Sequence, residues 1–139
     1  MMRASKESGE SHTGLVVLTH GTIGRSLIEV AEFILEQSLE EVHLVSFRQS
    51  AAANTGDGEI RQAIGRAERG QGVLVLTDVG GASPCNCVTR LLGSDQVAVV
   101  CGLNLAMLLR AWSYRNRPLK QLVKLALEGG VRDIKECTR

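Results

Sequence analysis

Aromatic side chains are scarce in this chain of 139 residues, which has one tryptophan, one tyrosine and two phenylalanines. Cationic side chains outnumber acidic ones by a single residue, so the formal net charge is +1. A nucleic-acid partner would require a clear excess of lysine and arginine to neutralise phosphates, and aromatic platforms on which bases stack. The composition therefore argues against nucleic-acid binding. It leaves the basic residues Arg110, Arg115, Arg117 and Lys120 as a solvated helix face or a docking surface for an acidic partner.

Long apolar runs are absent too. None reaches the ~18 residues that a membrane-spanning helix needs, so direct membrane insertion is not expected. Residues 1–13 are polar and lack the apolar stretch of a signal peptide, and we expect them to form a disordered tail. Residues 14–139 have the size of one domain, and the protein is expected to be cytoplasmic.

The cysteines do not form a pattern typical of disulfides or of a metal site. Cys101 ends an apolar run, and Cys85 and Cys87 have no second pair at the spacing that zinc requires. Small thiols that pack the start of a helix explain Cys85 and Cys87 better. The sequence therefore predicts neither a metal nor a cofactor.

What the chain does have is a regular alternation of short apolar runs and amphipathic stretches. The runs consist almost wholly of valine and leucine, which is typical of parallel strands buried on both faces. The stretches between them carry apolar residues at helical spacing; in the first, Ile23, Leu27, Val30, Ala31 and Ile34 are spaced to line one face. The expected strands are Leu15–Thr19, Val42–Phe47, Val73–Thr77 and Val97–Cys101.

This alternation predicts an α/β fold, a doubly wound three-layer sandwich around a mostly parallel sheet of order 2-1-3-4. Gly129 and Gly130 are expected to stop the last helix, and Val131–Cys137 to form a short terminal strand. A lone terminal strand needs a sheet edge to pair with. We therefore expect a homodimer in which this antiparallel edge strand is exchanged between subunits.

Two polar residues directly follow the first and third expected strands. His20 comes after the run that ends at Thr19, and Asp78 after the run that ends at Thr77. In the order 2-1-3-4 these strands are neighbours, and chemistry in such sheets gathers beyond their carboxyl ends. Either residue alone is as consistent with a polar loop position. Together they suggest a carboxylate that fixes the imidazole tautomer and leaves one ring nitrogen free as a nucleophile.

A turn of small residues follows Asp78. Gly81 and Ala82 let backbone amides approach a ligand closely, and Ser83 adds a hydroxyl donor. Pro84 is a favoured first residue of a helix, whose amino end attracts anions. The turn is therefore a candidate oxyanion or phosphate cradle. His43, inside the second strand, and His12, in the tail, are not expected to take part.

Four stretches resemble, in order and spacing, the IIA domain of the mannose family of the bacterial phosphoenolpyruvate-dependent sugar phosphotransferase system. They are Thr19–Gly21, Leu76–Asn86, Cys101–Arg110 and Gly129–Gly130. The resemblance extends over Gly14–Cys137, essentially the whole expected domain. It departs from the family pattern at Ala82, where a second glycine is frequent, and at Ala106, where proline is usual.

The resemblance implies a phosphotransferase component with a phosphohistidine intermediate. His20 would accept the phosphoryl group from an HPr-like carrier and pass it to a IIB partner. Asp78 would orient and charge His20, while Ser83 and the backbone of Gly81 and Ala82 would hold the phosphoryl oxygens. The family is typically dimeric. The residues expected to shape the site are Thr19, Gly21, Pro84, Asn86 and Asn104.

Other readings stay open at this point. No IIB module follows the domain, so the phosphate could serve regulation instead of sugar transport. The phosphocarrier subunit of a dihydroxyacetone kinase system is similar, although the turn Gly81–Asn86 matches the mannose type better. A receiver-like signalling domain phosphorylated on Asp78 would need acidic Mg²⁺ ligands after the first strand, where this chain has His20. A plain ligand-binding domain with an inert His20 is the remaining alternative.

Overall fold

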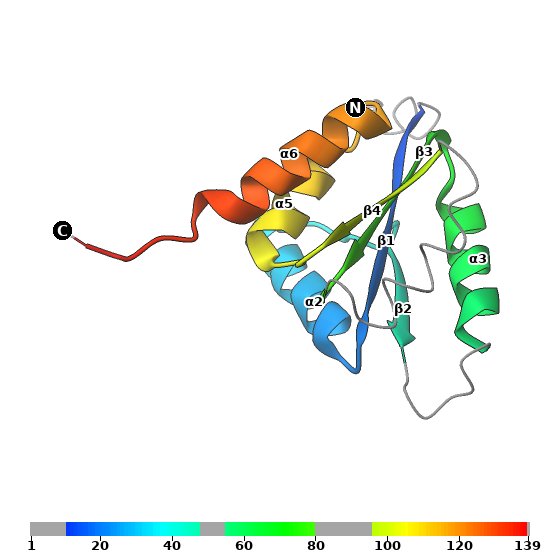
Figure 1. Ribbon diagram of the computed structural model, residues 1–139, viewed down its shortest axis with the longest axis horizontal. Helices are drawn as coiled ribbons and strands as arrows, with labels where there is room; N and C mark the ends of the chain where they lie inside the picture. Colours follow the sequence, from blue (N-terminus) through cyan, green and yellow to red (C-terminus); the bar gives the residue numbers. More distant parts are fainter. Residues whose placement is uncertain (1–10, 48–54, 80–95, 139) are drawn as a thin grey trace.

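The computed structural model describes residues 11–47, 55–79 and 96–138, and shows one parallel sheet with helices on both faces (Figure 1). The strand order is β2-β1-β3-β4, which confirms the predicted order 2-1-3-4 and the doubly wound α/β fold. The strands are β1 (His12–His20), β2 (His43–Phe47), β3 (Gly70–Thr77) and β4 (Val97–Cys101). The helices are α2 (Ile23–Leu35), α3 (Thr55–Ala67), α5 (Leu105–Ser113) and α6 (Leu119–Arg132).

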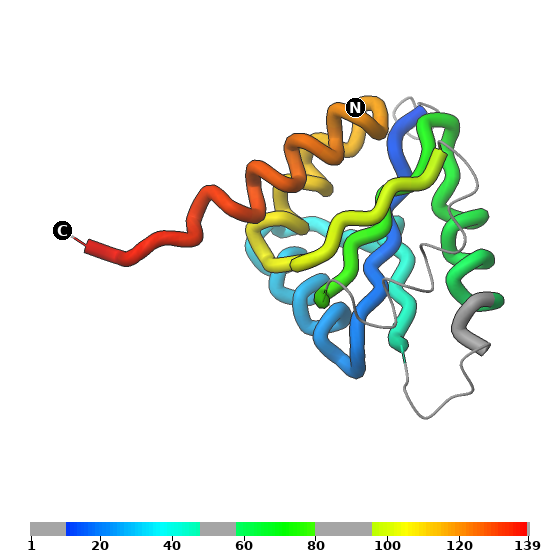
Figure 2. The backbone as a smooth tube through the Cα atoms, viewed as in Figure 1, coloured from blue at the N-terminus to red at the C-terminus, as the bar shows by residue number. Residues whose placement is uncertain are grey.

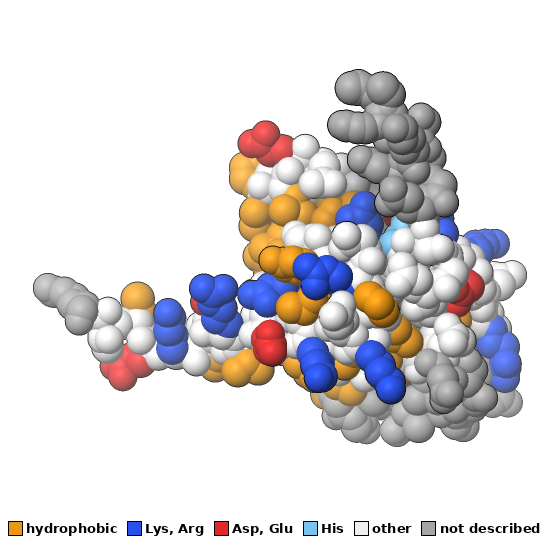
Figure 3. Space-filling view, turned by 90° about the horizontal axis from the view of Figure 1, so that it is seen from above, with side chains coloured by type: hydrophobic (Ala, Val, Ile, Leu, Met, Phe, Trp, Pro, Cys, Tyr) orange, Lys and Arg blue, Asp and Glu red, His pale blue; other side chains and the backbone are white. Residues whose placement is uncertain are grey.

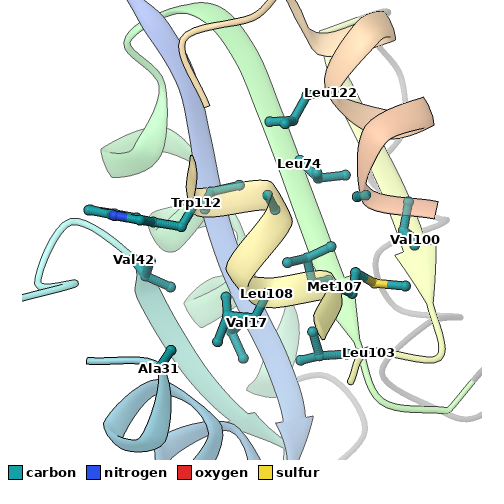
Figure 4. Close-up of a cluster of buried hydrophobic side chains, with 14 of the residues drawn as sticks. Val17, Ala31, Val42, Leu74, Val100, Leu103, Met107, Leu108, Trp112 and Leu122 are labelled. Carbon is teal, nitrogen blue, oxygen red and sulfur yellow. The ribbon is translucent and has the colours of Figure 1, made fainter. Parts of the chain in front are cut away.

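Alternate residues of the central strands supply two separate cores, because successive strand side chains point to opposite faces. Val17 and Leu74 belong to the larger cluster, which lies under α2, α5 and α6 (Figure 4). Val16 and Val73 belong to the cluster under α3. Burial on both faces explains why the middle of each central strand, Leu15–Leu18 in β1 and Val73–Leu76 in β3, is wholly apolar.

The first strand starts earlier than the sequence predicted. β1 begins at His12, so the last two residues of the expected tail belong to the sheet. Thr13 is buried, and its amide donates to the Arg115 carbonyl at 2.9 Å while its hydroxyl donates to the Arg117 carbonyl at 2.8 Å. Thr13, which the sequence assigned to the tail, is thus held in place, because the connection between α5 and α6 runs past the start of β1.

Helix α2 presents a different face to the sheet from the predicted one. Leu27 and Ala31 face the core as expected, but Ile23, Val30 and Ile34 are each about half exposed. The helix is rotated because Gly24, which has no side chain, lies closest to the sheet. The residues that pack inward are Gly24, Leu27, Ile28, Ala31 and Leu35.

The glycine pair near the end of the chain does not stop the last helix, contrary to the sequence prediction. Helix α6 continues through Gly129 and Gly130 to Arg132. A Cβ at Gly129 would lie 2.7 Å from the Cβ of Arg110, and one at Gly130 2.6 Å from the Cε of Met107. Both positions are therefore glycine because α5 and α6 cross closely there.

The chain beyond α6 leaves the body of the domain. Residues 133–138 form no strand within the described chain, and they extend away from the sheet (Figure 2). The exchanged terminal strand therefore stays a prediction. Its proposed segment is exposed, with Ile134 among the most exposed apolar residues.

Two residues of the basic cluster, Arg115 and Arg117, lie at the end of the domain where β1 begins, because their carbonyls accept hydrogen bonds from Thr13. Lys and Arg side chains gather on this end of the molecule, over α6 and its surroundings (Figure 3). The guanidinium of Arg115 lies 3.5 Å from the ring centroid of Trp112. Those of Arg110 and Arg117 lie 5.8 and 5.3 Å from the ring centroid of Tyr114. Arg115 and Arg117 are therefore not part of the His20 region, which lies at the other end of β1.

Candidate functional site

The structure brings His20 and Asp78 together at the carboxyl ends of β1 and β3. The backbone amide of His20 donates to Oδ2 of Asp78 at 2.9 Å. Nδ1 of His20 lies 3.1 Å from Oδ2 and 3.4 Å from Oδ1 of the same carboxyl group. The pair forms because β1 and β3 are adjacent parallel strands, so that their carboxyl ends meet at one edge of the sheet.

The Asp78 carboxylate is held in its charged form. Its side chain is only 8% exposed, and burial alone would raise its pKa. Hydrogen bonds from the backbone and ring of His20, with the charge of that ring, outweigh burial and hold the pKa of Asp78 below its ordinary value of 3.8. The amide of Val79 also donates to Oδ1 at 3.0 Å.

An ionised carboxylate has no hydrogen to donate, so it determines which nitrogen of His20 is free. The hydrogen between the two groups must lie on Nδ1 of the imidazole. In the neutral ring, Nε2 then carries the lone pair. The His20 side chain is 35% exposed, so this nitrogen belongs to a ring that a partner can approach. The arrangement is that of an oriented nucleophile.

Phe47, which the sequence did not single out, is the third side chain at this edge. The register of β1 and β2 places it opposite His20. The centroids of the two rings are 5.8 Å apart and their planes are inclined by 72°. In the sequence, the one feature that His20 and Phe47 share is that each ends an apolar strand. The register between those strands, which pairs the two residues, cannot be read from composition.

Thr19 and Gly21 shape the turn that carries His20. The hydroxyl of Thr19 is buried and accepts the Gly24 amide at 2.9 Å, which fixes the first turn of α2 against β1. Gly21 has a φ of +53°, in the left-handed region that favours glycine. Strand, His20 and helix are thereby joined by a turn with defined geometry.

Alanine at Gly24 is expected to destabilise the domain by about 1–3 kcal/mol, the usual cost of overpacking. Its Cβ would lie 2.5 Å from Oγ1 of Thr19 and 2.7 Å from Cδ1 of Leu44. Gly65→Ala in α3 is the matched control, because its Cβ would meet nothing within 4 Å. That variant should gain up to about 1 kcal/mol from helix propensity. Urea unfolding measures the stability of both variants. Equal unfolding midpoints for Gly24→Ala and Gly65→Ala would contradict the close packing at Gly24.

Asn104 links two helices. Its Oδ1 accepts the Met107 amide at 2.9 Å and so caps the start of α5, while its Nδ2 donates to the Gly130 carbonyl of α6 at 2.9 Å. These hydrogen bonds explain why an asparagine stands after β4. A direct influence on His20 stays a prediction.

The expected phosphate cradle lies outside the described residues. This concerns Gly81, Ala82, Ser83, Pro84 and Asn86, and also Cys85 and Cys87. Within residues 11–47, 55–79 and 96–138, no group of three or more His, Cys, Asp or Glu side chains is arranged to hold a metal ion. In the same part of the chain, no helix is both long and apolar enough to cross a membrane.

Residues 14–125 match a family model, EIIA-man, described as the IIA component of the fructose phosphotransferase system (PTS). The mannose-specific EIIAB component of the PTS of Escherichia coli K12 is 29% identical over 124 residues. The match covers 87% of this chain and 38% of that relative, so the chain spans well under half the length of the E. coli protein.

Solved structures show the same architecture. The mannose/sorbose-specific IIA subunit from Enterococcus faecalis superimposes with a TM-score of 0.82 at 23% identity, over 92% of this chain and 96% of that one. The PTS component EIIA from Streptococcus agalactiae has a TM-score of 0.78 at 22% identity, over 89% and 96% of the two chains. At these identities the likeness concerns the fold. Because the family model covers most of the sequence, the chain belongs to the mannose/fructose IIA family of the phosphotransferase system.

Proposed function

We propose that this IIA component is a phosphocarrier that accepts a phosphoryl group on Nε2 of His20 from the phosphohistidine of an HPr-like protein and passes it to a IIB component. The observation that carries the proposal is the hydrogen bond between Nδ1 of His20 and the ionised Asp78, at 3.1 Å. Transport and regulation would both use this chemistry. The identity of the sugar does not follow from it.

In this mechanism, the lone pair of Nε2 attacks the phosphorus of the donor phosphohistidine. A new N–P bond forms, the N–P bond of the donor breaks, and the donor imidazole leaves with the electron pair of that bond. Positive charge develops on the His20 ring as the bond forms. The Asp78 carboxylate, hydrogen-bonded to Nδ1, stabilises that charge without itself becoming protonated. Transfer to the acceptor reverses these steps.

The surface beside His20 supports a protein as donor. Helix α2 begins three residues after His20 and exposes large apolar side chains along its length, from Ile23 at its start to Phe33 in its last turn. Contiguous exposed apolar residues mark protein–protein contact sites on soluble domains. The other exposed apolar residues of α2 are Ile23, Val30 and Ile34.

A receiver-like mechanism with phosphorylation of Asp78 fits the geometry less well. Both carboxylate oxygens of Asp78 already accept N–H groups, from His20 and Val79. The carboxylate is also nearly buried, whereas the His20 ring is accessible. The nucleophile that a partner can reach is therefore the imidazole.

Incubation with phosphoenolpyruvate, enzyme I and an HPr-like carrier, followed by intact-mass measurement, tests the proposal. We expect a gain of one phosphoryl group that is labile in acid and stable in base. An unmodified mass beside a fully phosphorylated carrier would contradict it. So would a label stable in acid and labile in base, which would indicate an acyl phosphate.

We also propose that the protein is a homodimer in which residues 133–137, which follow α6, pair with the sheet edge of the neighbouring subunit; the sequence predicted that this strand begins at Val131, but Val131 and Arg132 belong to α6. Within the described sheet, β4 is an edge strand, and four of its five residues are only partly buried. Val131 and Ile134 are 62% and 72% exposed in the single chain. An edge strand and an exposed terminal segment can pair with each other across a subunit boundary.

Truncation after Arg132 is expected to dissociate the dimer and lower the melting temperature. This position is chosen because α6 ends there, so the helix stays whole. Light scattering and thermal unfolding of the truncated and full-length proteins measure the two effects. A full-length chain that is monomeric at micromolar concentration would rule out the exchange.

A further inference from the structure

The ring of Phe47 has a geometry toward His20 that goes beyond filling space. The centroids are 5.8 Å apart and the planes are inclined by 72°, which is an edge-to-face arrangement. Aromatic pairs prefer this arrangement at centroid distances of roughly 4.5–7 Å. Phe47 is also partly buried against the core cluster under α3, so its own position is fixed.

The His20 imidazole needs a second constraint besides Asp78. The hydrogen bond from Nδ1 fixes one point of the ring. The torsion about the bond between Cβ and the ring is broad in histidine, so the plane can still tilt about that point. A tilt moves Nε2, because this nitrogen lies on the far side of the ring from Cβ. Phosphoryl transfer depends on alignment of the attacking atom with the phosphorus and the leaving nitrogen.

We infer that Phe47 is a positioning residue for phosphoryl transfer, which holds the plane of the His20 ring so that Nε2 faces the incoming phosphoryl group. The inference rests on the proposed function of His20. Asp78 sets the tautomer and stabilises charge, whereas Phe47 sets the orientation. The two constraints come from opposite neighbours of β1, since Phe47 ends β2 and Asp78 follows β3.

Two variants separate orientation from packing. Phe47→Leu keeps an apolar side chain in the core but removes the aromatic edge, and Phe47→Tyr keeps the ring. Tyr114→Leu is the matched control, because it removes a partly exposed aromatic ring that follows α5, near the start of β1 and away from His20.

In single-turnover transfer from a saturating phosphorylated carrier, Phe47→Leu should lower the rate about two- to tenfold, the range expected from loss of an aromatic pair. The apparent affinity for the carrier should not change. Phe47→Tyr should restore the rate to within about twofold of the parent. Parental rates in Phe47→Leu would overturn the inference, as would equal losses in both Phe47 variants.

Proton NMR of the unphosphorylated protein supplies a readout that does not depend on transfer. The carbon-bound ring protons of His20 should show a ring-current shift that persists in Phe47→Tyr and is lost in Phe47→Leu, while the Nδ1–H resonance to Asp78 is retained. Unchanged ring-proton shifts in Phe47→Leu would refute the orienting contact. Failure of the proposed function is distinguishable, since then no variant, the parent included, would accept phosphate, whereas the NMR result would stand.

Discussion

Replacement of His20 by alanine is expected to abolish phosphoryl acceptance completely while the domain stays folded. Among the described residues at this edge, His20 supplies the accessible ring nitrogen with a free lone pair, so its removal takes away the proposed nucleophile. The variant keeps the hydrogen bond between β1 and Asp78 that does not involve the imidazole, because the backbone amide at position 20 still donates to the carboxylate. Intact mass after incubation with the phosphorylated carrier measures acceptance, and thermal unfolding measures the fold.

The matched control is the double variant His12→Ala/His43→Ala, which keeps His20 as the sole histidine. His12 lies at the start of β1, 3.5 Å from Glu41, far along the strand from His20. Burial and then the charges of Arg69 and Arg66 lower the pKa of His43, which favours its neutral, nucleophilic form and makes it a fair competitor for the phosphoryl group. The double variant should gain one phosphoryl group. A phosphorylated His20→Ala protein would place the acceptor elsewhere.

Asp78→Asn is expected to slow transfer by about 10²- to 10⁴-fold, as removal of the charge beside a catalytic imidazole does elsewhere. The amide has nearly the shape of the carboxylate but no negative charge to stabilise the developing imidazolium. Its NH₂ group can also donate to Nδ1, which would place the ring hydrogen on Nε2 and occupy the nucleophilic lone pair. Rapid-quench measurement of transfer tests this, and a parental rate would refute the role of Asp78.

The same variant carries a prediction about pH and stability. The folded-state pKa of Asp78 is lowered from 3.8, so ionised Asp78 stabilises the fold above that value. This contribution is lost as the pH falls through the folded-state pKa. The parent and Asp78→Asn should therefore converge in melting temperature toward strongly acidic pH, and the parent should be the more stable at pH 7. Divergence toward acid would contradict the lowered pKa.

The sequence was sufficient for the fold and for the central pair because both follow from short-range patterns. Runs of valine and leucine identify buried parallel strands, and the right-handed crossover rule confines their order. Once β1 and β3 are neighbours, His20 and Asp78 must share an edge. No side-chain detail was needed for that step.

Features that depend on contacts between elements could not be predicted in this way. The rotation of α2 follows from Gly24 lying against Thr19 at the end of β1 and against Leu44 of β2, which is not its neighbour in the sequence. Gly129 and Gly130 resemble a helix stop, yet they are the crossing point of α5 and α6. Glycine is suited both to the end of a helix and to a close crossing of two helices. Only the position of the neighbouring helix shows which of the two applies. The contact of Phe47 with His20 depends on strand register.

The central position of β1 has a consequence for the order in which the chain folds. β1 is synthesised first, but its second neighbour, β3, is complete only at Thr77, and the bond from the His20 amide to Asp78 joins residues 58 apart. Such long-range pairings form late and slow the folding of parallel sheets. A nascent chain or intermediate with only β1 and β2 paired would therefore lack the carboxylate that sets the tautomer of His20. The titration of Asp78 would report when β3 joins β1.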